Sequence, residues 1–124
     1  MTPSVIDGYE PRPFGHWINE AQDLGFNMLT HHDKRSFEVW IRLEPRTRKA
    51  RTAVDMMLGD HHPNNAIEVK TVYDKASAEI RASGIEPPPR DDLASALALG
   101  FDDAAAEAVR MAREALDRLE AARG

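Results

Sequence analysis

The chain has 124 residues, 42% of them hydrophobic and 6% aromatic, and a formal net charge of −5 at pH 7. This length predicts a core that needs no disulfide or metal for stability, and the absence of cysteine excludes disulfides, thiolate metal sites and cysteine nucleophiles. The acidic balance argues against a protein that coats nucleic acid, and the lack of a signal sequence or of an apolar run near ~20 residues predicts a soluble, cytoplasmic protein with no membrane role.

The N-terminal part predicts an extended arm followed by one short helix. Prolines punctuate residues 1–14, which we expect to be extended. The helix then follows from an apolar stripe, and Gly25 is placed where a left-handed residue ends a helix. The stripe consists of Trp17, Ile18, Ala21 and Leu24.

Residues 26–43 predict a β-hairpin. From Ser36 to Leu43 apolar and polar residues alternate strictly, which is the pattern of a half-buried strand. A single strand leaves its backbone groups unsatisfied, so we expect it to pair with residues 26–30 through the polar turn "HHDKR". Trp40 then lies on the polar side, where it either packs under another element or is exposed as a binding residue.

The next segment predicts an antiparallel pair of helices. Apolar residues between Ala50 and Leu58 recur at helical spacing, and Gly59 follows as a stop. A second helical stripe covers residues 65–83, and Asn65 with Glu68 three residues later resembles a capping box.

Three consecutive prolines divide the rest of the chain from this part. We expect residues 1–84 to form a small α+β core domain, residues 85–90 an extended spacer, and residues 91–124 a C-terminal helical segment. In that segment we expect a short helix ending at Gly100 and a longer one over 103–123, whose alanine-rich stripe either packs on the body or forms a self-association seam.

Two histidine doublets raise the possibility of a metal site. The sequence "HHD" occurs in the expected hairpin turn and "DHH" in the expected interhelical turn, and imidazole with carboxylate suits Zn²⁺ or Fe²⁺. If the two turns met, the candidate ligands would be His31, His32, Asp60, His61 and His62. The alternative is that these are ordinary polar surface turns, with no cofactor.

The segment Glu68-Val69-Lys70 allows two interpretations. As a strand, it would direct Glu68 and Lys70 to one face, where an acid such as Asp55 could join Glu68 on a divalent metal. The order Glu20, Asp55, Glu68-x-Lys70 then resembles that of PD-(D/E)xK nucleases and Holliday-junction resolvases, and the resemblance implies that Asp55, Glu68 and Lys70 are catalytic. As a helix, it would make Glu68 and Lys70 diverge by about 200°, and the helical periodicity on both sides favours this interpretation.

The densest basic cluster lies between the expected strand and helix. It consists of Arg42, Arg46, Arg48, Lys49 and Arg51. These residues form either a phosphate-binding surface or the solvated face of an amphipathic helix.

We therefore predict an α+β fold, predominantly α, with a short β-hairpin, an antiparallel helix pair and a C-terminal helical segment. The expected function is that of a non-enzymatic interaction or regulatory protein, which binds a protein partner or a second copy of itself through the hairpin, with Trp40, and through the long C-terminal helix. The alternatives are the metal-dependent nuclease and non-catalytic nucleic-acid binding through residues 42–51.

Overall fold

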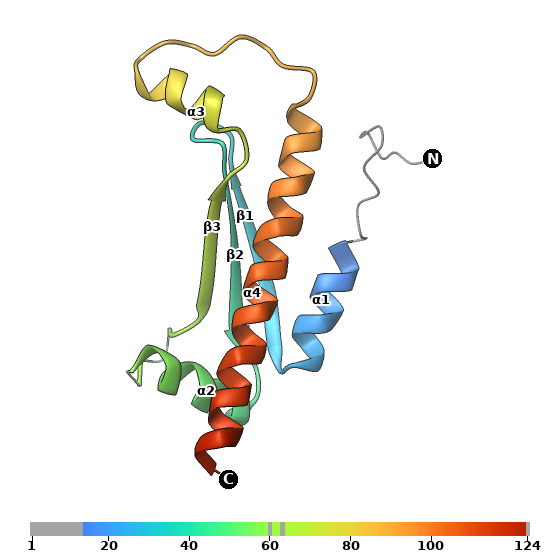
Figure 1. Ribbon diagram of the computed structural model, residues 1–124, viewed down its shortest axis with the longest axis vertical. Coiled ribbons are helices and arrows are strands. Elements are labelled where there is room, and N and C mark those ends of the chain that lie inside the picture. The colour runs from blue at the N-terminus through green and yellow to red at the C-terminus, as the bar shows by residue number, and fades with distance from the viewer. Residues whose placement is uncertain (1–13, 60, 63, 124) are drawn as a thin grey trace.

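The computed structural model describes residues 14–59, 61–62 and 64–123. The described residues form an α+β fold that is mostly helical, in which three antiparallel strands in the order β1-β2-β3 are packed against helices (Figure 1). The fold class expected from the sequence is confirmed. The elements, in chain order, are α1 (Phe14–Asp23), β1 (Phe26–Asp33), β2 (Glu38–Pro45), α2 (Arg48–Leu58), β3 (Ile67–Val72), α3 (Lys75–Ala82) and α4 (Leu93–Arg123).

The first helix and the hairpin form where the sequence predicts them. Gly25 ends α1 with φ +93, and a Cβ there would lie 2.7 Å from the Thr47 Oγ1 atom, so only glycine fits. The hairpin places Phe26 opposite Pro45 and Asp33 opposite Glu38. Both histidines of the first doublet therefore belong to β1, and the turn covers residues 34–37 rather than the predicted 31–35.

The prediction of a helix over residues 65–83 is wrong in its first half. Residues 67–72 form β3, which pairs along its whole length with β2. Pairing of this β-branched segment with the central strand overrides the helical periodicity. The second helix starts only at α3, where the Asp74 carboxylate accepts a hydrogen bond from the Ser77 N–H at 3.2 Å. The expected antiparallel helix pair is thus a helix, α2, followed by a strand.

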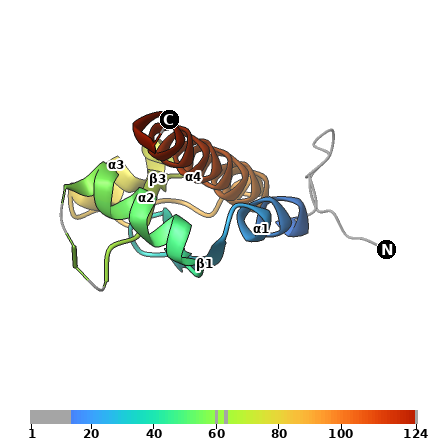
Figure 2. The same ribbon diagram turned by 90° about the horizontal axis from the view of Figure 1, so that it is seen from below.

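The C-terminal helix α4 is continuous and covers one face of the sheet (Figures 1 and 2). The break predicted at Gly100 is wrong, because Gly100 is buried inside the helix and a Cβ there would lie 2.8 Å from the Tyr73 Cβ. Glycine at this position lets the helix closely approach Tyr73, the residue that follows β3. The alanine-rich stripe of α4 is buried, as the body-packing interpretation predicts.

The core lies between α4 and the inner face of the sheet. Val39, Ile41 and Leu43 of the central strand are fully buried there. Helix α1 lies beside α4, to which the Trp17 indole N–H donates a hydrogen bond at Asp102 (2.8 Å). The segment after the proline spacer therefore contributes to the same core as the sheet. Within the described residues, none of the helices combines the length and apolar character needed to cross a membrane.

Candidate functional site

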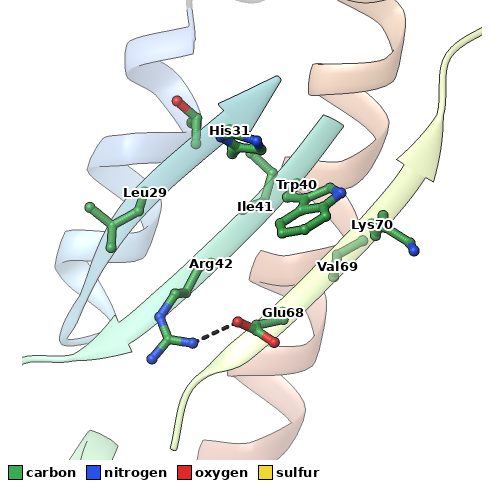
Figure 3. Close-up of a pocket in the computed structure, with 9 residues that line it drawn as sticks. Leu29, His31, Trp40, Ile41, Arg42, Glu68, Val69 and Lys70 are labelled. Atoms are coloured by element: carbon green, nitrogen blue, oxygen red, sulfur yellow. Dashed lines mark hydrogen bonds and ion pairs between the residues drawn. The ribbon is translucent and has the colours of Figure 1, made fainter. Parts of the chain in front are cut away.

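The face of the sheet that α4 does not cover carries side chains from all three strands. Side chains alternate along a strand, so every second residue points to this face. The register aligns these side chains in two rows across the sheet, and each row has one residue from each strand. We call this surface the open face, defined by Leu29, His31, Trp40, Arg42, Glu68 and Lys70 (Figure 3).

Trp40 occupies the centre of the open face and is 43% exposed. The His31 ring lies on one side, 5.2 Å away between ring centroids, and the Lys70 ammonium lies on the other at 6.0 Å. The indole N–H donates to the Glu38 carboxylate at 3.3 Å. The tryptophan is therefore held between cross-strand neighbours on the central strand of the sheet, and part of its ring remains in contact with solvent.

The cations of the open face already have carboxylate partners. Arg42 donates to Glu44 at 2.9 Å and to Glu68 at 2.6 Å, and these hydrogen bonds, that with Glu44 first, raise the pKa of Arg42 above its ordinary value. Lys70 lies 3.5 Å from the Glu38 carboxylate. Each of these two cations is therefore paired with at least one carboxylate. The surface that remains to be covered is mainly the ring of Trp40 and the side chain of Leu29, which is 47% exposed.

A shallow hollow of about 400 Å³ lies over this surface. Figure 3 shows Leu29 on β1 and Trp40 on β2 beside this hollow, with the Arg42–Glu68 ion pair along one margin. This arrangement of an apolar floor and a polar margin suits an inserted apolar side chain better than a free ion.

The residues of the nuclease hypothesis do not come together. The expectation that Glu68 and Lys70 diverge is wrong, because both extend from β3 to the open face. Asp55, however, lies on α2 and lines a different hollow, and the Glu20 carboxylate is paired with Arg113 of α4. In the described part of the chain, no three histidine or carboxylate side chains are grouped closely enough to hold a metal ion.

Asp55 instead fastens the loop that follows α2. Its buried carboxylate accepts a hydrogen bond from the Asn65 side-chain amide at 3.0 Å and lies 3.2 Å from His61 Nδ1. The hydrogen bond from Asn65, and then that from His61, hold the pKa of Asp55 below its ordinary value of 3.8. Asp55 therefore has a structural role that connects α2 to the start of β3.

This arrangement predicts a pH-dependent contribution to stability. A carboxyl group whose pKa is lowered by folding stabilises the protein at pH above 3.8, and this contribution is lost as the pH falls through the lowered pKa. We expect Asp55→Asn to lower Tm by several degrees at neutral pH and by progressively less below pH 4. Thermal unfolding across a pH series measures this, with Asp117→Asn on the exposed side of α4 as the control. A Tm difference that does not change with pH would contradict the interpretation.

The histidines occupy separate environments. His31 is on the open face, whereas His32, the next residue of β1, points to the inner side, where its Nε2 and the Tyr73 hydroxyl share a hydrogen bond of 2.9 Å. Burial lowers the pKa of His32. His61 contacts Asp55, and His62 Nδ1 accepts the Asn64 N–H at 3.1 Å. Asp60, the remaining member of the predicted metal set, lies outside the described residues.

The basic cluster is divided between several elements. Arg42 is on the open face, and Arg46 and Arg48 are exposed around the start of α2. Lys49 is paired with Glu120 of α4, and Arg51 donates to the His62 carbonyl at 3.0 Å. The cluster therefore does not present one continuous row of unpaired cations.

Sequence reasoning identified Trp40 but missed Leu29, which completes the open face. The signal that finds Leu29 is the strand alternation, carried from Trp40 through the paired register to β1. Comparisons of the chain with protein-family models, with curated proteins and with solved structures return no match.

Proposed function

We propose that this chain is a non-enzymatic interaction protein whose open face binds a protein partner, with Trp40 as the central contact. The observation that carries the proposal is the 43% exposure of Trp40 on the central strand of the sheet. Tryptophan on a rigid support is the residue type most enriched among energetically dominant interface contacts. Leu29 extends the apolar surface, and the hollow beside them accepts a side chain of the partner.

The charges favour a protein over a nucleic acid as the partner. Binding to phosphates requires cations that are free to replace counterions, but Arg42 and Lys70 are both engaged by carboxylates. The net charge of −5 acts in the same direction. A protein segment with an apolar or aromatic side chain, and polar groups around it, matches the apolar floor and polar margin. The lack of cysteine is compatible with a cytoplasmic site of action.

The proposal differs from the sequence expectation in one respect. The long C-terminal helix was expected to provide a second binding surface, but its alanine stripe is buried against the sheet. The proposed interface is therefore restricted to the hairpin and β3.

A substitution at Trp40 tests the proposal. We expect Trp40→Ala to weaken binding of a purified partner by at least about 30-fold, which corresponds to about 2 kcal/mol for a central interface residue, while changing the unfolding free energy by less than about 1 kcal/mol because the side chain is on the surface. The partner is first isolated on immobilised wild-type protein, and its affinity is then measured by calorimetry. Met56→Ala is the matched control, since Met56 is an equally exposed apolar residue on α2. Equal affinity of the wild type and Trp40→Ala would refute the proposal.

The nuclease remains a second candidate because Glu68 and Lys70 share a face. Incubation with DNA and RNA in Mg²⁺ or Mn²⁺ tests it directly. Cleavage that is lost in both Glu68→Ala and Lys70→Ala would favour this candidate over the binding proposal. Salt-sensitive retention on DNA without cleavage would favour nucleic-acid binding.

A further inference from the structure

Strand β3 has one side without a partner strand in the part of the chain that the structure describes. The strand order β1-β2-β3 places it at an edge of the sheet, and Figure 1 shows α3 beyond one of its ends and α2 beyond the other. An edge strand presents a row of backbone N–H and C=O groups that another strand can bind.

One hydrogen bond establishes which backbone groups face this edge. The Tyr73 N–H donates to the Phe37 carbonyl of the neighbouring chain segment at 2.8 Å, so the backbone of Tyr73 faces β2. Successive residues of an antiparallel strand direct these groups to alternate sides. The backbone groups of Val69 and Thr71 therefore also face β2, whereas Glu68, Lys70 and Val72 direct their backbone N–H and C=O groups to the free edge of β3.

The segment Glu68-Val69-Lys70 is complementary to itself in an antiparallel pairing. If a two-fold axis passes at Val69, Glu68 of each copy lies directly opposite Lys70 of the other copy. Both are residues whose backbone groups face the edge, so the same alignment also forms the interstrand hydrogen bonds. An axis at Glu68 or at Lys70 would place like charges opposite each other. A shift of the pairing by one residue would place backbone groups that face the free edge opposite backbone groups that face β2.

The two charged side chains are available for such a pairing. The Glu68 side chain is 66% exposed and that of Lys70 is 58% exposed. Each Glu68 would lie between Arg42 of its own chain, now 2.6 Å away, and Lys70 of the second copy. Charges on an edge strand commonly prevent edge pairing, but here opposite signs meet, and opposite charges across a strand pair stabilise it.

We infer that two copies of this chain associate through β3, antiparallel and centred on Val69, and form one six-stranded sheet. The association does not depend on the proposed role of Trp40. It does place both open faces on the same side of the joined sheet, because the two-fold axis is perpendicular to it. A partner with two binding segments then gains from simultaneous attachment to both.

Charge reversal tests the register. Sedimentation equilibrium should show a dimer for the wild type and at least a tenfold weaker dimer for Glu68→Lys and for Lys70→Glu, because each single change opposes like charges at both ends of the pairing. Glu79→Lys and Lys75→Glu make the same charge changes on exposed positions of α3 and should leave the dimer unchanged.

Mixing the two weakened variants provides a rescue. An equimolar mixture of Glu68→Lys and Lys70→Glu opposes unlike charges at both ends again, so the mixture should form a heterodimer with an affinity near that of the wild type. Loss of folding in either variant cannot produce this result. A wild-type chain that is monomeric throughout the accessible concentration range would overturn the inference, as would a dimer that both variants retain.

A single cysteine tests the centre of the pairing. In the proposed alignment Val69 faces Val69 of the second copy in a non-hydrogen-bonded pair, where the Cα atoms lie about 4.5 Å apart, within the range that a disulfide spans. Since the chain has no cysteine, Val69→Cys should form a disulfide-linked dimer on oxidation, whereas Thr71→Cys, opposite residue 67, should not. Equal cross-linking of both variants, or of neither, would overturn the proposed register.

Trp40→Ala should leave all these results unchanged, so failure of the partner-binding proposal is distinguishable from failure of this one.

Discussion

Replacement of Phe26 by alanine is expected to remove a large part of the stability of the fold. Phe26 is fully buried at the start of β1 and is the largest of the fully buried side chains. Truncation of a buried phenylalanine costs about 3–5 kcal/mol, because the lost apolar burial is compounded by the cavity that remains. Domains of this size are stable by only about 5–15 kcal/mol in total. Urea unfolding should therefore show a greatly lowered midpoint with a similar dependence on denaturant concentration.

The control for this prediction lies three residues further along the same strand. Leu29 points to the open face and is 47% exposed, so Leu29→Ala should change the unfolding free energy by less than about 1 kcal/mol. Similar losses in the two variants would mean that the two faces of the sheet are equally buried, for example by an element that covers the open face.

The substitution Gly100→Val is expected to destabilise the fold in spite of valine's better helix propensity. A Cβ at this position would lie 2.8 Å from the Tyr73 Cβ and 3.4 Å from the Val39 Cγ2, so α4 would have to move away from the sheet. Overpacking of this kind costs about 1–3 kcal/mol, which exceeds the gain of well under about 1 kcal/mol in helix propensity.

Gly15→Val in α1 provides the matched control. A Cβ at Gly15 meets no atom within 4 Å, so valine there should be neutral or slightly stabilising. The comparison is made by chemical unfolding of both variants under the same conditions. A Gly100→Val protein as stable as Gly15→Val would show that the contact between α4 and Tyr73 is not close in solution.

The parts of the fold that could be predicted are those where local pattern and tertiary packing agree. The alternation from Ser36 to Leu43 predicts both a strand and its buried face, and burial of Val39, Ile41 and Leu43 confirms it. The end of α1 was predictable because the left-handed backbone of Gly25 is a local feature that commonly follows a helix. The same alternation from Ser36 to Leu43 also predicts Trp40 on the polar side of its strand.

Prediction failed where two patterns overlapped in the same residues. Val69, Val72 and Ile80 lie at helical spacing, but the first two also belong to a β-branched run that pairs with the central strand. The periodicity of a single sequence does not show which segments pair with each other in space. Asn65 was interpreted as a helix start, whereas its amide binds Asp55. Gly100 is predicted to end a helix, but its actual role is to leave room for Tyr73. The sequence around Gly100 does not reveal this role, because Tyr73 is distant in the chain.

Helix α4 follows all three strands in the chain, and this order determines when the core can form during synthesis. The inner face of the sheet, with Ile41 and Leu43, is covered by residues of α4 such as Ala108 and Ala112. The ribosome makes the strands before it makes their cover. Until residues 93–123 have emerged, the nascent chain exposes the apolar face of the sheet, so we expect these strands to need protection by ribosome-associated chaperones until α4 is available.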